Sequence, residues 1–205
     1  MQAVGVIPAR FSSRRFPGKV TVPIAGIPMI ERVWRNARAC ARLRDVLIAT
    51  DDPRIQVLCE GFGATAILTS PLHPSGTDRI AEVAASLPDD VIVNVQGDEP
   101  LIEPFVIEAA LAALEAAPDV PMATVAHPAE EGALDDPNRV KVVTDRRGRA
   151  LYFSRARIPF ARSHKAWWQH VGLYAYRRDF LLRFPTLEPT PAELAEGLEQ
   201  LRALE

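Results

Sequence analysis

Lysine and cysteine are both scarce in this 205-residue sequence. Three of the 24 basic residues are lysines, so arginine supplies the other 21, and arginine suits bidentate binding of phosphate and carboxylate groups. Codon usage is the simpler explanation for most surface arginines, but the scarcity makes Lys19, in a Pro-Gly-Lys turn, stand out. The two cysteines, Cys40 and Cys59, lack the spacing of metal ligands. We expect them to be small buried residues of a reducing cytoplasm.

The sequence also lacks a long apolar run and a marked net charge. No apolar run approaches the length of a membrane span, and the N-terminus does not resemble a signal peptide. A net charge of −2 argues against a broad nucleic-acid-binding face. Hydrophobic residues make up 48% and charged residues 24%, as in ordinary globular proteins. We therefore expect a cytoplasmic chain with no membrane or nucleic-acid partner, folded as a single domain over residues 1–205.

The order of the elements predicts an α/β fold. Strands are predicted at residues 3–7, 45–50, 64–68, 91–95, 121–126 and 170–176, and helices at 28–39, 54–60, 80–86, 105–116, 178–184 and 191–205. Alternation of strand and helix up to about Pro121 implies a Rossmann-like, doubly wound, mostly parallel sheet. Residues 140–144 and 149–153 predict a β-hairpin inside an insert at about 130–170. We expect this insert to act as a substrate lid or a dimer contact.

The β-branched run at 91–95 predicts a strand buried on both faces. It stops at Gln96-Gly97-Asp98-Glu99-Pro100. A carboxylate at the carboxyl end of such a strand is well placed to hold a hard divalent cation that bridges substrate phosphates. An equally acceptable interpretation is a turn in which Asp98 or Glu99 caps the following helix.

The loop after the first predicted strand is unusually basic. Residues 9–19 contain three arginines, two serines and Lys19, which together with backbone N–H donors form a phosphate-binding surface. The spacing is neither that of a Walker A loop nor that of a dinucleotide-binding fingerprint. The alternative is a solvated basic loop without a function. The position of the loop directly after the first strand favours phosphate binding.

A second polar loop leads into a predicted helix through Ser75-Gly76-Thr77-Asp78-Arg79. Hydroxyl and amide donors at a helix N-terminus favour anions. Helix capping alone would explain Thr77 or Asp78, but not Arg79. Nearby, His73 stands between two loop prolines and is expected to be an ordinary exposed histidine.

Three other features leave alternatives open or predict a structural role. Asp51-Asp52 is expected to cap the next helix rather than bind metal. His170 and Tyr174 fall on one face of the last predicted strand, which suits either a pocket wall or a half-exposed sheet surface. Trp167 and Trp168, if exposed, would suit a subunit interface, and if buried would belong to the core.

Six segments together carry a family resemblance. They are Ile7-Pro8-Ala9-Arg10 through Pro17-Gly18-Lys19, Ser75 to Arg79, Asn94 to Pro100, Tyr152-Phe153-Ser154-Arg155 with Ile158-Pro159, His170 to Tyr174, and Leu198-Glu199-Gln200-Leu201-Arg202. In this order they resemble the 3-deoxy-manno-octulosonate cytidylyltransferases, the CMP-Kdo synthetases, over essentially the whole chain. The resemblance implies a fold of the nucleotide-diphospho-sugar transferase type.

The resemblance also implies a reaction and its residues. CTP and 3-deoxy-D-manno-octulosonate (Kdo) would give CMP-Kdo and pyrophosphate for lipopolysaccharide biosynthesis, with Mg²⁺, in a homodimer. The implied catalytic residues are Arg10, Lys19 and Asp98, and Asp98 is the implied metal ligand. The implied nucleotide-binding residues are Pro8, Ala9, Arg10, Ser13, Arg15, Lys19, Ser75 and Asp78. The implied sugar-binding residues are Arg79, Gln96, Arg155, His170, Tyr174, Glu199 and Gln200.

The chain departs from the family at its end. Family members continue past Leu198–Arg202 with a strand and a turn whose aspartate is the second magnesium ligand, whereas this sequence stops at Glu205. We therefore expect the C-terminal part of the family fold to be absent. The alternatives are a cytidylyltransferase for another acid sugar, of the sialic acid type, or a truncated, catalytically deficient nucleotide-binding form.

Overall fold

The computed structural model of the chain describes residues 1–12, 16–163 and 166–205. It forms two compact units. The first comprises Met1–Ala123 and Leu173–Pro185, and the second comprises Thr124–Gly172 and Thr186–Glu205. The insert expected at 130–170 falls inside the second unit, and its role as a lid or dimer contact stays a prediction.

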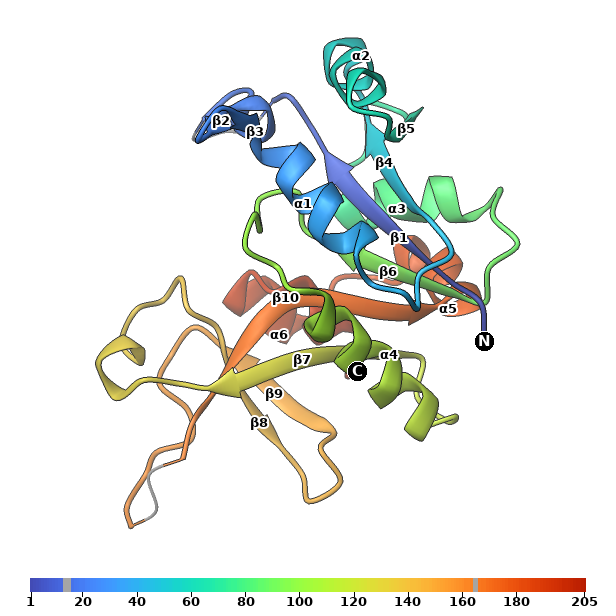
Figure 1. The fold of residues 1–205 in the computed structure, drawn as a ribbon. Helices are drawn as coiled ribbons and strands as arrows, with labels where there is room; N and C mark the ends of the chain where they lie inside the picture. Colours follow the sequence, from blue (N-terminus) through green and yellow to red (C-terminus); the bar gives the residue numbers. More distant parts are fainter. Residues whose placement is uncertain (13–15, 164–165) are drawn as a thin grey trace. The chain divides into compact units, whose positions relative to one another are not determined.

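A mostly parallel sheet forms the centre of the first unit (Figure 1). Its strands are β1 (Ala3–Ala9), β4 (Val46–Thr50), β5 (Thr65–Leu68) and β6 (Val91–Val95), in the spatial order β5-β4-β1-β6 and all parallel. The far side of β6 pairs antiparallel with Leu173–Arg177 of β10 (Trp168–Arg177). This arrangement confirms the predicted α/β sheet.

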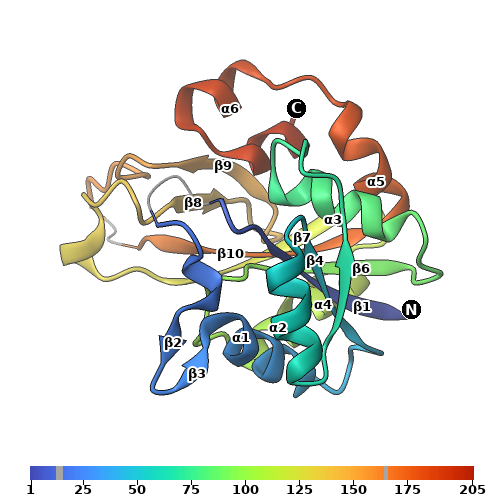
Figure 2. The ribbon, with the colours of Figure 1, turned by 90° about the horizontal axis from the view of Figure 1, so that it is seen from above.

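Helices cover both faces of this sheet (Figures 1 and 2). On one face α1 (Met29–Arg38) packs with α4 (Pro104–Ala116), and on the other α3 (Gly76–Ala84) packs with α5 (Arg178–Arg183). The remaining helix, α2 (Pro53–Gly61), packs against β4 and β5. Every residue of β6 is buried because both faces of the sheet are covered, as its β-branched run predicts. The shorter elements are η1 (Lys19–Thr21), β2 (Pro23–Ile24), β3 (Ile27–Pro28) and η3 (Phe184–Thr186).

Side-chain caps fix where two of these helices begin. The carboxylate of Asp52 accepts a hydrogen bond from the backbone N–H of Arg54, which confirms the predicted cap of α2. Ser75 caps α3 by accepting from the N–H of Asp78. The helix therefore begins at Gly76, and the predicted start at Ile80 is wrong because Ser75 provides an earlier cap.

The second unit contains the predicted hairpin, formed by β8 (Lys141–Thr144) and β9 (Ala150–Ser154). Its turn is held by the Asp145 carboxylate, which accepts from two backbone N–H groups, and by Gly148 at a φ of 79°. The strand β7 (Met122–Pro128) lies in this unit from Thr124 onwards, and the short helix η2 (Glu131–Ala133) follows it.

The predicted helix at 191–205 is wrong as a single element. The structure has α6 (Pro191–Glu196) and then η4 (Glu199–Ala203). Gly197, at a φ of 62°, stops α6 in the left-handed conformation, and its N–H donates to the carbonyl of Glu193. After this break the chain changes direction, and Leu198 and Leu201 pack in a small core with residues of the hairpin.

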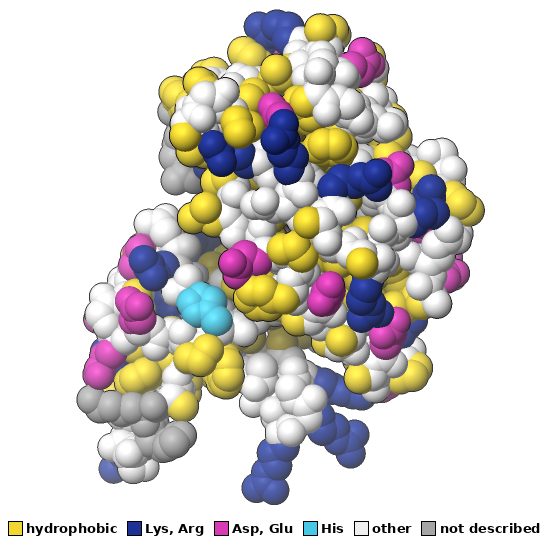
Figure 3. Space-filling view, viewed as in Figure 1, with side chains coloured by type: hydrophobic (Ala, Val, Ile, Leu, Met, Phe, Trp, Pro, Cys, Tyr) yellow, Lys and Arg dark blue, Asp and Glu magenta, His cyan; other side chains and the backbone are white. Residues whose placement is uncertain are grey.

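Two further expectations concern membranes and thiols. Within the described ranges, none of the helices has the length and apolar character needed to cross a membrane. Cys40 and Cys59 are free and buried, and burial raises the pKa of the Cys59 thiol to about 12. On the face seen in Figure 3, basic and acidic side chains are interspersed over most of the surface, and a group of basic side chains projects at its lower end.

Candidate functional site

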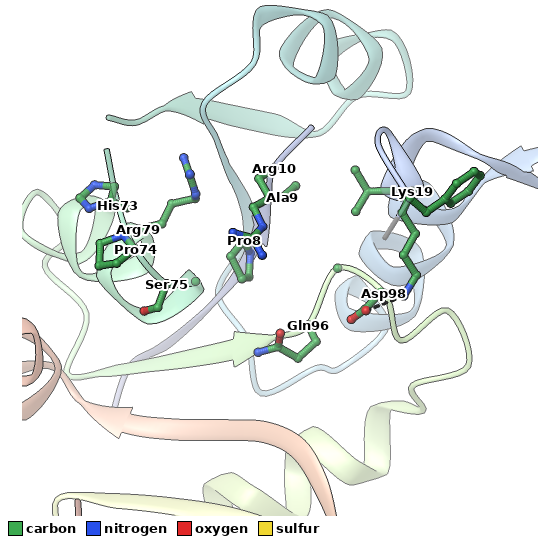
Figure 4. A pocket seen from close by; sticks show the side chains of 14 residues that line it. Pro8, Ala9, Arg10, Lys19, His73, Pro74, Ser75, Arg79, Gln96 and Asp98 are labelled. Carbon is green, nitrogen blue, oxygen red and sulfur yellow. Dashed lines mark hydrogen bonds and ion pairs between the residues drawn. The ribbon is translucent and has the colours of Figure 1, made fainter. Parts of the chain in front are cut away.

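A cavity of about 700 Å³ opens in the first unit, at the carboxyl ends of two neighbouring strands (Figure 4). It is lined by Pro8, Ala9, Arg10, Phe16, Lys19, Val20, His73, Pro74, Ser75, Gly76, Arg79, Gln96, Gly97 and Asp98. These residues follow or end β1 and β6, or lie near the start of α3. From β1 the chain order runs to β4 and β5 on one side and to β6 on the other, so the cavity lies at the switch point where open α/β sheets bind ligands.

Close backbone packing requires glycine at the floor of this cavity. A Cβ atom built on Gly97 would lie 2.9 Å from the carbonyl oxygen of Pro8, and one built on Gly76 would lie 3.3 Å from the Pro8 ring. The end of β1, the loop after β6 and the start of α3 therefore meet at Pro8. Only glycine at position 97 permits that approach without displacement of the backbone.

The basic loop is closed at its base so that Lys19 faces the cavity. The N–H of Gly18 donates to the carbonyl of Phe11 over 2.8 Å, and Gly18 has a φ of 70°. The Phe11 ring lies 3.5 Å from the guanidinium carbon of Arg54. Lys19 Nζ then reaches Asp98 Oδ2 at 2.7 Å, the ion pair drawn in Figure 4.

Asp98 and Glu99 do not cap the following helix, so that alternative is wrong. The helix α4 starts at Pro104, its N-cap is Glu103, and no side-chain cap bond is made. Asp98 is instead exposed and paired with Lys19. Partial burial, helped by the negative charge of Asp98, raises the pKa of Glu99, and Lys19 opposes this shift. The Asp98 carboxylate therefore lies in the cavity at the end of β6 and caps no helix.

Arg79 is buried in the wall of the cavity. Its Nη2 donates to Asp51 Oδ2 over 2.8 Å and its Nη1 donates to Thr69 Oγ1 over 2.5 Å. The expectation that Asp51 caps a helix is therefore wrong, because Asp52 is the cap and Asp51 binds Arg79. The bonds from Arg79 to Asp51 and to Thr69 tie the ends of β4 and β5 to α3.

His73 also belongs to the cavity, contrary to the expectation of an ordinary exposed histidine. Its side chain is 21% exposed and its Nε2 contacts the carboxylate of Glu82. The hydrogen bond from His73, followed by one from the backbone N–H of Ser70, lowers the pKa of Glu82. One feature of the sequence could have indicated that His73 lies at the site, because it precedes Ser75 by two residues. The prolines on either side give no indication of the direction in which this loop folds.

The structure brings most of the predicted nucleotide-binding residues together. Pro8, Ala9, Arg10, Lys19 and Ser75 line the cavity. Asp78 is bound to Ser75, whose Oγ donates to the Asp78 carboxylate over 2.5 Å. Ser13 and Arg15 lie outside the described residues.

The predicted sugar-binding residues are divided between the units. Arg79 and Gln96 line the cavity, and Tyr174 lies on β10 opposite Asn94 of β6. Arg155, His170, Glu199 and Gln200 belong to the second unit.

Arg155 is anchored by carbonyl groups of the second unit. Its Nε, Nη1 and Nη2 donate to the carbonyls of Glu196, Pro137 and Gly197 at 2.7, 2.9 and 3.2 Å. The buried Lys141 donates to three further carbonyls, including that of Arg155 at 2.5 Å, and burial lowers its pKa. Three of the five N–H groups of the Arg155 guanidinium donate to carbonyls, which leaves two without a partner among the described residues.

His170 and Gln200 are buried in the second unit, whereas Glu199 is half-buried. His170 Nε2 lies 2.8 Å from Thr124 Oγ1, and burial lowers the pKa of His170 to about 4. Trp167 is buried and donates to the carbonyl of Pro159, so it belongs to the core, whereas Trp168 is exposed.

Comparison with known proteins identifies the family. The model of the cytidylyltransferase family matches residues 4–205. The chain belongs to this family. Relatives named 3-deoxy-manno-octulosonate cytidylyltransferase include one from Solibacter usitatus, 52% identical over 98% of this chain and 82% of that protein. Another, from Myxococcus xanthus, is 50% identical over 100% of this chain and 84% of that protein.

Solved structures agree with this assignment. The structure of a CMP:2-keto-3-deoxy-manno-octonic acid synthetase complexed with CTP has a TM-score of 0.96 and 44% identity, covering 100% of this chain and 86% of that one. A cytidylyltransferase from Leptospira borgpetersenii, at 15% identity and a TM-score of 0.64, shares the fold. The family resemblance predicted from the sequence of this cytidylyltransferase is therefore confirmed.

Proposed function

We propose that this cytidylyltransferase transfers CMP from CTP to Kdo, giving CMP-Kdo and pyrophosphate for lipopolysaccharide biosynthesis. The observation that carries the proposal is the cavity at the ends of β1 and β6, which Arg10, Lys19 and Asp98 line together. Relatives of this chain are named 3-deoxy-manno-octulosonate cytidylyltransferase. The CTP bound by the similar synthetase supports the choice of nucleotide.

The chemistry needs positioning and charge neutralisation rather than a covalent intermediate. The anomeric hydroxyl of Kdo attacks the α-phosphorus of CTP, and pyrophosphate leaves in line. Arg10 and Lys19 would hold the triphosphate, as would Ser13 and Arg15. Lys19 would stabilise the charge that accumulates on the leaving group. Backbone and side-chain groups of Pro8, Ala9, Ser75 and Asp78 would complete the nucleotide site.

The donor set at the end of β6 fits a magnesium ion that shares its ligands with phosphates. The described residues contain no group of three or more histidine, cysteine or acidic side chains able to hold a metal. Mg²⁺ is commonly bound by one or two carboxylates plus substrate phosphates, and Asp98 is an exposed carboxylate at the right strand end. When bound, the ion would neutralise phosphate charge. Asp98 would hold the ion, and Lys19 would leave its ion pair with Asp98 and bind a phosphate group instead.

The acid sugar requires a cation for its carboxylate and hydrogen-bonding groups for its hydroxyls. We assign Arg155 to the carboxylate, because three of its N–H groups are anchored to carbonyls while one on Nη1 and one on Nη2 remain for a ligand. The other groups assigned to the sugar are Arg79, Gln96, His170, Tyr174, Glu199 and Gln200.

We also propose that the enzyme is a cytoplasmic homodimer. Phe160 and Trp168 of the second unit are 88% and 43% exposed, and aromatic side chains of this kind suit a subunit contact. Two free, buried thiols suit a reducing compartment.

The proposal is tested by measuring pyrophosphate release with CTP, Mg²⁺ and Kdo, omitting each in turn. Release that needs all three supports it, and sialic acid in place of Kdo should give none. Absence of release from a chain that CTP still protects against heat would favour the catalytically deficient nucleotide-binding form.

A further inference from the structure

Asn94 is a polar residue in the middle of an otherwise apolar buried strand. It lies in β6, is 1% exposed, and is preceded and followed by valine. Because side chains alternate along a strand, Asn94 shares a face with Ile92 and with Gln96. Ile92 packs in the core of the first unit, whereas Gln96 lines the cavity. Asn94 therefore stands between the core and the cavity.

The Asn94 amide uses only part of its hydrogen-bonding capacity. Its Oδ1 accepts from Gln96 Nε2 over 3.0 Å. Its Nδ2 is buried and has no hydrogen-bond partner in the described part of the chain. A buried donor without a partner costs free energy that leucine at the same position would avoid. Stability of the fold alone does not explain asparagine here.

The one bond that Asn94 makes determines what Gln96 presents to the cavity. The bond from Nε2 to Asn94 fixes the orientation of the Gln96 amide, so that Oε1 and the second N–H of Nε2 are left for a ligand. In Figure 4 this oxygen points upwards, to the side on which Pro8 and Arg10 lie, and the nitrogen points to the left. An amide oxygen accepts from hydroxyl groups and repels the oxygens of phosphates and carboxylates.

We propose that Asn94 is a positioning residue that holds Gln96 as a hydrogen-bond acceptor for a hydroxyl of the sugar substrate. The inference rests on the proposed function for the identity of that substrate. It assigns Gln96 to the polyol part of the acid sugar, and not to its carboxylate or to the triphosphate.

The orientation is tested first without any ligand. In Asn94→Leu we expect the Nε2 proton of Gln96 that is bonded to Asn94, followed by NMR, to exchange with solvent about tenfold faster, since it loses its acceptor. Asn94→Asp retains the acceptor oxygen and should keep slow exchange. Val93→Ala, a buried change on the opposite face of β6, should lower the melting temperature and leave this exchange unchanged. Unchanged exchange in Asn94→Leu would overturn the proposal.

The role in recognition is tested by kinetics. Asn94→Leu should raise the KM for Kdo about tenfold and leave the KM for CTP unchanged, without a loss of melting temperature. In a Gln96→Ala background the same change should add nothing, because Asn94 acts through Gln96. Additive effects would overturn the proposal. A wild-type chain that releases no pyrophosphate with Kdo would refute the proposed function and the hydroxyl assignment together, while the exchange experiment still decides the orientation.

Discussion

Lys19 Nζ lies 2.7 Å from Asp98 Oδ2, so the cation and the carboxylate of the cavity neutralise each other. Both side chains are more than one third exposed, at 39% and 46%, and ion pairs of this kind add little stability. We therefore expect this pair to affect the binding of nucleotide and metal more than the stability of the fold. A nucleotide with a metal would separate them, with Lys19 turning to phosphate and Asp98 to the cation.

Asp98→Asn should abolish turnover and leave the fold intact. The amide cannot supply the negative charge that holds a divalent cation, so we expect pyrophosphate release to fall at least about 100-fold. The melting temperature should stay close to that of the wild type, because only an exposed pair is lost. Asp90→Asn, an exposed aspartate at the other end of β6, is the matched control. A variant at Asp98 that keeps its full rate in the magnesium assay would contradict the metal assignment.

Gly97→Ala should damage both stability and nucleotide binding. The added methyl group would lie 2.9 Å from the Pro8 carbonyl oxygen, so the backbone must shift, at a cost of about 1–3 kcal/mol. We expect a lower melting temperature and a higher KM for CTP. Gly61→Ala is the control, because a Cβ there meets nothing within 4 Å and helix α2 should be unchanged or slightly more stable. If Gly97→Ala and Gly61→Ala had the same melting temperature and the same KM for CTP, the close contact between Gly97 and Pro8 would not be required for stability or for nucleotide binding.

Arg155→Ala should weaken Kdo more than CTP. The change removes the guanidinium proposed for the sugar carboxylate, together with its three bonds to carbonyls of the second unit. We expect the KM for Kdo to rise about 100-fold and stability to fall by about 1–3 kcal/mol. Arg147→Ala, in the exposed hairpin turn, controls for loss of charge. An unchanged KM for Kdo with a raised KM for CTP would reverse the assignment.

Acid should destabilise the protein through His170. Burial lowers its pKa from 6.5 to about 4, so between these values the unfolded chain binds a proton that the folded chain does not. Stability should therefore be fully present above pH 6.5 and fall as the pH drops towards 4, by about 3 kcal/mol in total. Urea titrations of the wild type and His170→Gln across this range provide the measurement. The variant should lose less, and parallel losses would assign the acid sensitivity to other groups.

The sheet and much of the cavity followed from local patterns in the sequence. The buried run of β6 and the small residue after it sufficed to place Gly97 and Asp98 at a strand end. The errors arose where the role of a residue depends on a partner that is distant in the sequence. Asp51 is bound by Arg79, 28 residues away in the chain, and no local pattern distinguishes it from the capping Asp52.

The C-terminal helix illustrates the same limit. Residues 191–205 have helical periodicity, yet Gly197 adopts a left-handed conformation and the chain turns to bury Leu198 and Leu201 against Phe153. The contribution of that tertiary contact outweighs helix propensity. His73 was missed for a related reason, since its position depends on Glu82 of the neighbouring helix.

The placement of β10 has a consequence for the growing chain on the ribosome. All the residues that line the cavity have been synthesised once Asp98 has emerged, but the outer edge of β6 pairs with Leu173–Arg177. Until those residues arrive, the edge presents unpaired backbone groups on a strongly apolar strand, the kind of surface through which nascent chains aggregate. The last strand of the first unit thus protects the newly made cytidylyltransferase, and any fragment that ends before Leu173 carries that exposed edge permanently.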